Sequence, residues 1–178
     1  MGQVNVANWA YSFKPIVDPQ SRLIILGSMP GIKSLTAEQY YAHPQNAFWR
    51  IMSALLGFTP EIDYVNKVAA LQLAGIALWD VLQACQREGS LDSSIAADSQ
   101  VANDFNALFR DYPQIETVCF NGAKAEAYFK QVILPTLAPS ERRYIRLPST
   151  SPAHAAMSFS AKLEAWRQAI RPESIVVA

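Results

Sequence analysis

The sequence predicts an α/β fold in which a mainly parallel sheet is covered by helices on both faces. Two observations carry this prediction. Short apolar runs typical of buried strands alternate with longer segments of helical periodicity, and most runs end at a glycine or a polar loop. Strands separated by helices favour a parallel sheet, whose strand-end loops gather at one edge, where ligands bind.

The individual elements follow from these patterns and from the glycines and prolines that end them. The expected strands are 23–26, 76–80, 118–120 and 143–147. The expected helices are 48–56, 64–74, 81–85, 104–112, 123–134 and 161–170. We expect one domain over residues 1–178, with 1–21 as a partly extended lead-in and 171–178 as a short tail.

The composition is ordinary for a globular protein, with 51% hydrophobic and 17% charged residues. The net charge of +0 removes any global electrostatic argument for nucleic-acid binding and leaves only local patches. No apolar run is long enough to cross a bilayer, and the first residues lack a secretory pattern, so we expect a cytoplasmic protein. Cys85 and Cys119 lie in apolar surroundings and are expected as reduced core thiols.

The chain is organised around residues 22–49. A buried strand runs into Gly27, Ser28, Met29, Pro30 and Gly31. This turn lacks the lysine of a phosphate-binding P-loop and the GxGxxG pattern. Its glycines would let backbone amides approach a small ligand closely, although a purely structural turn is an equal interpretation.

The segment 40–49 then brings aromatic, imidazole and amide side chains together. Tyr41 is the candidate for stacking on a planar base, because the loop before Pro44 has no helical periodicity that would bury it. Phe48 and Trp49 begin a helix and are expected in the core.

Two asparagines are the main candidates for recognition and chemistry. Asn46 precedes a helix and Asn121 follows a buried strand. A side-chain amide offers a donor and an acceptor together, which suits the edge of a nucleobase or the placing of a water. Either asparagine could instead cap a turn, and the sequence leaves that alternative open.

His43 and His154 are the only histidines, and both fall in candidate site loops. Asp80 is expected to cap the helix predicted at 81–85, so no carboxylate has an evident acid–base role, and no metal-ligand cluster is evident. Several basic residues flank the predicted edge and could contact phosphates, although a solvated surface is expected for at least half of them: Lys33, Lys124, Lys130, Arg142, Arg143 and Arg146.

Taken in order over residues 22–170, the motifs GSMPG, YYAHPQNAFW, LWDVL, FNGAKA and LPSTSPAHA resemble the uracil-DNA glycosylase superfamily. The hypoxanthine (deoxyinosine) branch is the most similar, with the mismatch-specific branch next. The resemblance implies a three-layer α/β/α sandwich around a central, mainly parallel four-stranded sheet.

The resemblance also implies roles for individual residues. Residues 27–31 would surround an extruded base. Many relatives carry a catalytic Asp or Asn there, whereas this chain has Ser28 and Met29, so Asn46 is the expected replacement. Tyr41 would stack on the base and Asn121 would read its edge.

A second motif would enter the minor groove and grip the strand, with Lys124 as a further DNA contact: Ser149, Thr150, Ser151, Pro152, Ala153 and His154. Ala153 stands where relatives often carry a bulky leucine wedge, so His154 is either a substitute wedge or a phosphate contact.

The implied function is a monofunctional DNA glycosylase of base excision repair that flips out hypoxanthine or uracil and hydrolyses its N-glycosidic bond. It would act as a monomer on DNA containing deaminated bases, without cofactor or metal. Two alternatives stay open. One is a sensor that binds damaged or mismatched DNA without cutting it, and the other is a small nucleotide-binding protein.

Overall fold

The centre of the computed structural model, which describes residues 9–170, is a four-stranded parallel sheet in the order β3-β2-β6-β7. Its strands are β2 (Leu23–Gly27), β3 (Ile76–Asp80), β6 (Thr117–Asn121) and β7 (Arg143–Leu147). These ranges are close to those expected, and the predicted parallel sheet is confirmed.

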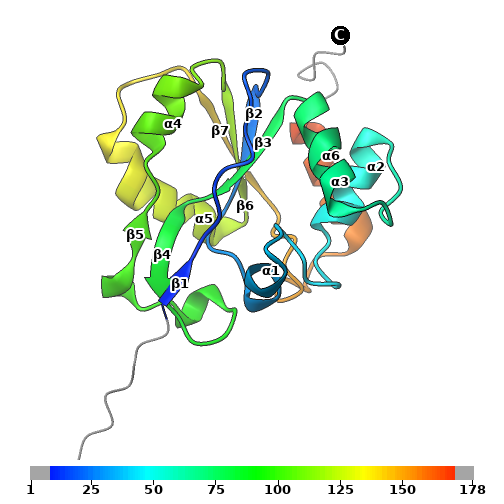
Figure 1. Ribbon diagram of the computed structural model, residues 1–178, viewed down its shortest axis with the longest axis horizontal. Helices are drawn as coiled ribbons and strands as arrows, with labels where there is room; N and C mark the ends of the chain where they lie inside the picture. The colour runs from blue at the N-terminus through cyan, green and yellow to red at the C-terminus, as the bar shows by residue number, and fades with distance from the viewer. Residues whose placement is uncertain (1–8, 171–178) are drawn as a thin grey trace, which may run out of the picture.

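Helices cover both faces of this sheet, which gives the predicted three layers (Figure 1). One face carries α2 (Phe48–Leu56), α3 (Tyr64–Leu73) and α6 (Phe159–Ala169). The other carries α4 (Phe105–Asp111) and α5 (Ala123–Tyr128), and α5 continues through a π-helical turn at Phe129–Ile133 into a 3₁₀ turn at Leu134–Thr136.

The apolar run of β2 is continuous because both of its faces are buried. Leu23 and Ile25 pack into the core under α2, α3 and α6. Ile24 and Leu26 face the opposite core, which is rich in phenylalanine from α4, β6 and the turn after α5. A parallel strand covered on both faces reads as an unbroken hydrophobic run, which is why the sequence pattern located this strand well.

A second, antiparallel sheet in the order β1-β4-β5 corrects one prediction. Its strands are β1 (Trp9–Tyr11), β4 (Leu82–Gln86) and β5 (Val101–Ala102), so the helix expected at 81–85 is wrong. A short apolar run does not distinguish strand from helix by itself. The partner that makes β4 a strand is β1, far away in sequence.

Short helical turns also occur in segments expected to be loops. They are α1 (Ile32–Ala37), η1 (Asp92–Ser94) and η2 (Ala97–Ser99). Part of the expected lead-in is extended, as β1 shows, while its residues 1–8 and the tail 171–178 lie outside the described residues. Cys85 and Cys119 are buried free thiols, as expected. Within residues 9–170, no helix has the length and apolar character needed to cross a membrane.

Helix α3 offers a test of this layer arrangement. Leu71 is 0% exposed and Leu73 is 81% exposed on the same helix. We expect Leu71→Ala to lower the free energy of unfolding by about 2–5 kcal/mol, because it leaves a cavity in the core under α2 and α6. The matched variant Leu73→Ala should change it by less than about 0.5 kcal/mol. Urea unfolding of both variants measures the difference, and equal losses would contradict the packing described.

Candidate functional site

The carboxyl ends of the parallel strands bring the predicted site loops to one edge of the sheet. Gly27 of β2 is in register with Asp80 of β3, and Asn121 of β6 is in register with Leu147 of β7. The loop after Gly27, with α1 in it, lies beyond this edge at the bottom of Figure 1. The expected convergence of loops at one sheet edge is therefore observed.

Thr150 links two of these loops to β6. The amide Nδ2 of Asn121 donates to Thr150 Oγ1 over 2.9 Å, and the Thr150 N–H donates back to Asn121 Oδ1 over 2.9 Å. The Thr150 carbonyl accepts from the N–H of Ala47 over 3.0 Å. Thr150 is only 1% exposed. Asn121 and the segment that carries Asn46 are thus both attached to the loop that follows β7.

Asn46 is held at the start of α2. Its Oδ1 accepts from the N–H of Phe48 over 2.9 Å, and its own N–H donates to the carbonyl of His43. The capping role left open by the sequence is therefore real. Because the side chain is only partly buried, the amide Nδ2 and the second lone pair of Oδ1 are available to a ligand or a water.

Tyr41 adopts a left-handed backbone conformation with φ 56°. Its ring stacks on Phe48, with ring centroids 4.0 Å apart and an interplanar angle of 23°. The hydroxyl Oη is buried and makes no hydrogen bond of good geometry within the described residues. Burial and the negative charge of Asp80 raise the pKa of Tyr41, and the Asn121 amide partly opposes this. Phe48 thus supports one face of the ring expected to stack on a base.

Asp80 is a site residue that the sequence reasoning missed. No helix follows it, so its expected role as a helix cap is wrong. Asp80 is 4% exposed, and its Oδ2 is buried without a hydrogen-bond partner among the described residues. A Cβ placed on Gly27 would lie 2.6 Å from Asp80 Oδ1 and 3.3 Å from Tyr41 Oη. Gly27 is therefore required by the close approach of these two side chains.

The surroundings of Asp80 favour its protonated form. Burial, with the negative charge of Asp92 added to it, raises the pKa of Asp80 to about 8, although Arg87 acts in the opposite direction. The only hint in the sequence was a carboxylate at the end of an apolar strand.

Residues 87–92 pack behind the Gly27–Gly31 turn and hold it by hydrogen bonds. The Oγ of Ser28 donates to Asp92 Oδ2 over 2.5 Å. Buried Arg87 donates from Nη2 to the carbonyl of Pro30, and Ser90 Oγ accepts from the N–H of Ile32 over 2.9 Å. Met29 is buried in a small cluster with Leu82 and Cys85, so its side chain is structural.

The loop of the second motif forms a tight turn with an exposed tip. Ser151 accepts from the N–H of Ala153 at its Oγ and from the N–H of His154 at its carbonyl, while its own N–H donates to Ser149 Oγ. Pro152, Ala153 and His154 are exposed. The tip is thus open to contact with a large partner.

The remaining predicted residues lie at different distances from this edge. His43 is partly buried and accepts at Nδ1 from the N–H of Gln45, which makes it part of a turn. Lys124 is exposed at the start of α5, close enough to Asp92 to affect its pKa. Arg142 and Arg143 lie at the amino end of β7, at the edge opposite the site.

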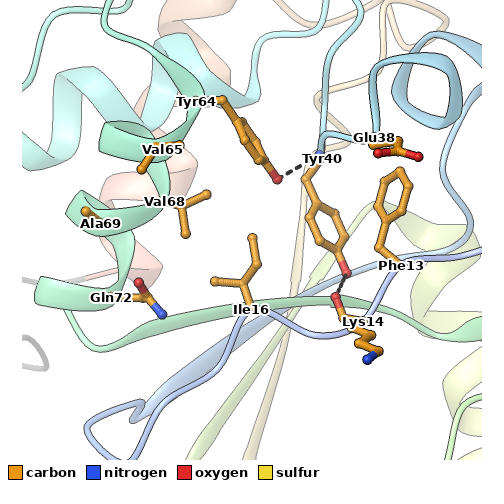
Figure 2. Close-up of a pocket in the computed structure, with 10 residues that line it drawn as sticks. All are labelled: Phe13, Lys14, Ile16, Glu38, Tyr40, Tyr64, Val65, Val68, Ala69 and Gln72. Carbon is orange, nitrogen blue, oxygen red and sulfur yellow. Dashed lines mark hydrogen bonds between the residues drawn. The ribbon is translucent and has the colours of Figure 1, made fainter.

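A cavity of about 480 Å³ lies apart from these groups, between α3 and the segment 13–16 (Figure 2). Tyr40 lines it and donates from its hydroxyl to the carbonyl of Lys14, while the Tyr40 N–H donates to Tyr64 Oη. None of Ser28, Asn46 or Asn121 lines this cavity.

Comparison with known proteins identifies the family of this chain. The family model described as "Uracil DNA glycosylase superfamily" matches residues 14–173. This chain belongs to the uracil DNA glycosylase superfamily. The resemblance inferred from the motifs and the α/β fold class are both confirmed.

Relatives within the superfamily carry a more specific name. The chain is 36% identical over 141 residues to a hypoxanthine DNA glycosylase of Methanosarcina acetivorans, covering 74% of this chain and 88% of the relative. It is 40% identical over 117 residues to a hypoxanthine DNA glycosylase of Methanosarcina barkeri, covering 65% and 73%. A solution NMR structure from Methanosarcina acetivorans, provisionally named a uracil DNA glycosylase, has a TM-score of 0.77 and 32% identity, covering 92% of this chain and 98% of that one.

The buried carboxyl of Asp80 makes a prediction about stability and pH. Because its pKa is about 8 in the folded protein and about 3.9 in an unfolded chain, the folded state favours the proton. The stability that this preference contributes is complete below about pH 4 and is lost as pH rises to about 8, at up to about 1.4 kcal/mol per pH unit. Asp80→Asn has no proton to lose and should reduce this slope.

Urea unfolding between pH 5 and pH 8 measures the slope for both proteins. Asp98→Asn, which changes an exposed carboxylate of η2, is the control and should keep the wild-type slope. If Asp80→Asn also keeps that slope, Asp80 is ionised in the folded protein.

Proposed function

We propose that the protein is a monofunctional DNA glycosylase that flips hypoxanthine, and also uracil, out of DNA and hydrolyses the N-glycosidic bond. The names of its relatives support hypoxanthine as a substrate. The observation that carries the proposal is the link at Thr150, which attaches the loop of Asn46 to the amide of Asn121 at one sheet edge.

Recognition of the base would use the N–H of Asn121 that is not bonded to Thr150 and that lies on the side of Tyr41. A backbone N–H can only donate, so the bond from Thr150 fixes Oδ1 of Asn121 toward Thr150. Nδ2 then keeps one hydrogen beyond the one given to Thr150 Oγ1. That N–H suits the carbonyl O6 of hypoxanthine or O4 of uracil. Adenine and cytosine carry amino donors at these positions, so the interaction favours deaminated bases.

The flipped base would stack on Tyr41, whose ring is backed by Phe48, and would be bordered by the backbone of residues 27–31. Flipping costs a few kcal/mol and is cheapest at a mispair, which adds selectivity before any contact is made. The exposed tip at Pro152, Ala153 and His154 would contact the duplex, with Lys124 on a nearby phosphate. All of these groups belong to one chain, so we propose action as a monomer.

In the proposed reaction the bond between C1′ and the base breaks, and the base leaves with the electron pair. The N–H of Asn121 and the backbone amides of the Gly27 turn would stabilise the developing anion. A water held by the amide of Asn46 would add its oxygen to C1′ and release a proton to solvent. Asn46 is not a strong base, so its contribution comes from position. We expect no lysine to act as nucleophile, so the product would be an abasic site without strand cleavage.

The direct test incubates labelled duplexes that contain one deoxyinosine or one deoxyuridine, opposite each normal base, and then treats them with alkali. We expect alkali-dependent cleavage at the lesion, no cleavage without alkali, and the same rate in EDTA. Absence of cleavage at both lesions would show that the protein is not a glycosylase for either base. Tight binding to lesion duplexes that stay intact would instead identify a damage sensor, and affinity for free nucleotides alone would identify a nucleotide-binding protein.

Asn46 can be tested separately. We expect Asn46→Ala to lower the single-turnover rate on deoxyinosine by about 10²–10³-fold, as loss of a positioned polar group does in other enzymes. The variant also removes the hydrogen bond to the N–H of Phe48, which costs about 1 kcal/mol of stability. Asn46→Asp keeps a cap acceptor and serves as the stability control, and Asn106→Ala on the exposed face of α4 should leave the rate unchanged. A wild-type rate in Asn46→Ala would remove Asn46 from the mechanism.

A further inference from the structure

The hydrogen bond between Ser28 and Asp92 is not used in the function proposed above. It joins the turn after β2 to η1 across 64 residues of sequence, and its length is 2.5 Å. Ser28 is the one partly exposed residue among the otherwise buried positions 27–30. Ser28 is therefore partly exposed at the site edge, and its hydroxyl is held by Asp92.

The polarity of the Ser28 hydroxyl is fixed by its partner. A carboxylate can only accept, so Ser28 must give its single proton to Asp92. Burial raises the pKa of Asp92, and the Ser28 hydroxyl and the positive charges of Arg87 and Lys124 limit that rise without cancelling it. With its proton committed, the Ser28 oxygen offers only lone pairs to a ligand.

Ser28 and Asn121 lie at the ends of neighbouring strands. Leu26 is in register with Phe120, so Asn121 follows Phe120 directly and Ser28 follows Gly27, both at the same edge of the sheet. Thr150 fixes the orientation of the Asn121 amide, so its second N–H is not used by Thr150 and lies on the side of Tyr41, whose pKa it lowers. The edge thus presents a donor from β6 and an acceptor from the turn after β2.

We propose that Ser28, held by Asp92, accepts a hydrogen bond from the ring N–H of the flipped base and so determines specificity for deaminated bases. This inference rests on the proposed function and deepens it. Hypoxanthine presents N1–H beside O6, and uracil presents N3–H beside O4, in the order that Ser28 and Asn121 require. Adenine and cytosine present a bare ring nitrogen beside an amino group, which places acceptor against acceptor and donor against donor. Ser28 touches the base, and Asp92 is a positioning residue that acts through it.

The test measures binding to duplexes that carry 2′-fluoroarabino-inosine or 2′-fluoroarabino-nebularine, in which the fluorine slows hydrolysis. Nebularine is a purine without N1–H, and its bare N1 is an acceptor that cannot donate to Ser28. We expect Ser28→Ala to weaken binding to the inosine duplex by about 10-fold and to leave binding to the nebularine duplex unchanged or stronger, because the variant also removes the lone pair that opposes N1. Asp92→Asn should do the same, because the new amide can donate to Ser28 and free its proton.

Three variants serve as controls. Ser28→Thr keeps a hydroxyl beside Asp92 and should retain the wild-type preference for inosine. Ser93→Ala and Asp98→Asn change exposed neighbours of the same types and should also retain it. Thermal unfolding of each variant separates loss of fold from loss of recognition.

The outcomes decide between this inference and the proposed function. If Ser28→Ala and Asp92→Asn weaken binding to both duplexes equally, Ser28 is only structural and the inference is wrong, even where the wild type releases hypoxanthine from ordinary deoxyinosine DNA. If the wild type shows no preference between the two duplexes, the inference is also wrong. If the variants change the preference as expected but the wild type releases no base, the role of Ser28 in recognition is supported and the proposed glycosylase function is wrong.

Discussion

The geometry of the site depends on Thr150, a buried side chain that lies in neither a strand nor a helix. Its hydroxyl and N–H engage the amide of Asn121, and its carbonyl holds the segment just before α2. Loss of one partner would leave a buried polar group unsatisfied, at a cost of about 1–3 kcal/mol. Because Asn46 precedes Ala47 directly, the bond from Ala47 to Thr150 fixes the main chain at Asn46. The amide Nδ2 of Asn46 stays available for chemistry, while its Oδ1 accepts from Phe48.

The absence of a side chain at Gly27 is the second constraint. It admits the carboxyl of Asp80 and the hydroxyl of Tyr41 to the same small space. Neither Asp80 Oδ2 nor Tyr41 Oη has a hydrogen bond of good geometry within the described residues. Unsatisfied buried groups are costly, and proteins retain them mainly where function requires them. The proton on Asp80 keeps a second negative charge away from Asp92, whose ionised form supports the polarity proposed for Ser28.

The sequence predicted the framework better than it predicted the site. The strand at 76–80 was located correctly because a buried parallel strand is a nearly continuous apolar run between turn signals. The helix expected at 81–85 was wrong because only the distant β1 shows that this run is a strand. Asn46 and Asn121 could be singled out from local context. The bond from Ser28 to Asp92 and the burial of Asp80 could not, because both depend on tertiary approach of segments far apart in the chain.

The two outer strands of the central sheet are protected from pairing with another chain in different ways. On β3, the N–H and carbonyl of Leu78 are both bonded to Ile16, whose segment lies along that edge. On β7, no strand of the described residues pairs with the outer side, but Arg143 and Arg146 are exposed there. Charged side chains and covering segments are the usual means by which sheet edges avoid aggregation. The segment before β2 therefore covers the outer edge of β3 and leaves fewer free main-chain groups for pairing with another chain, although it lies outside the base-binding edge.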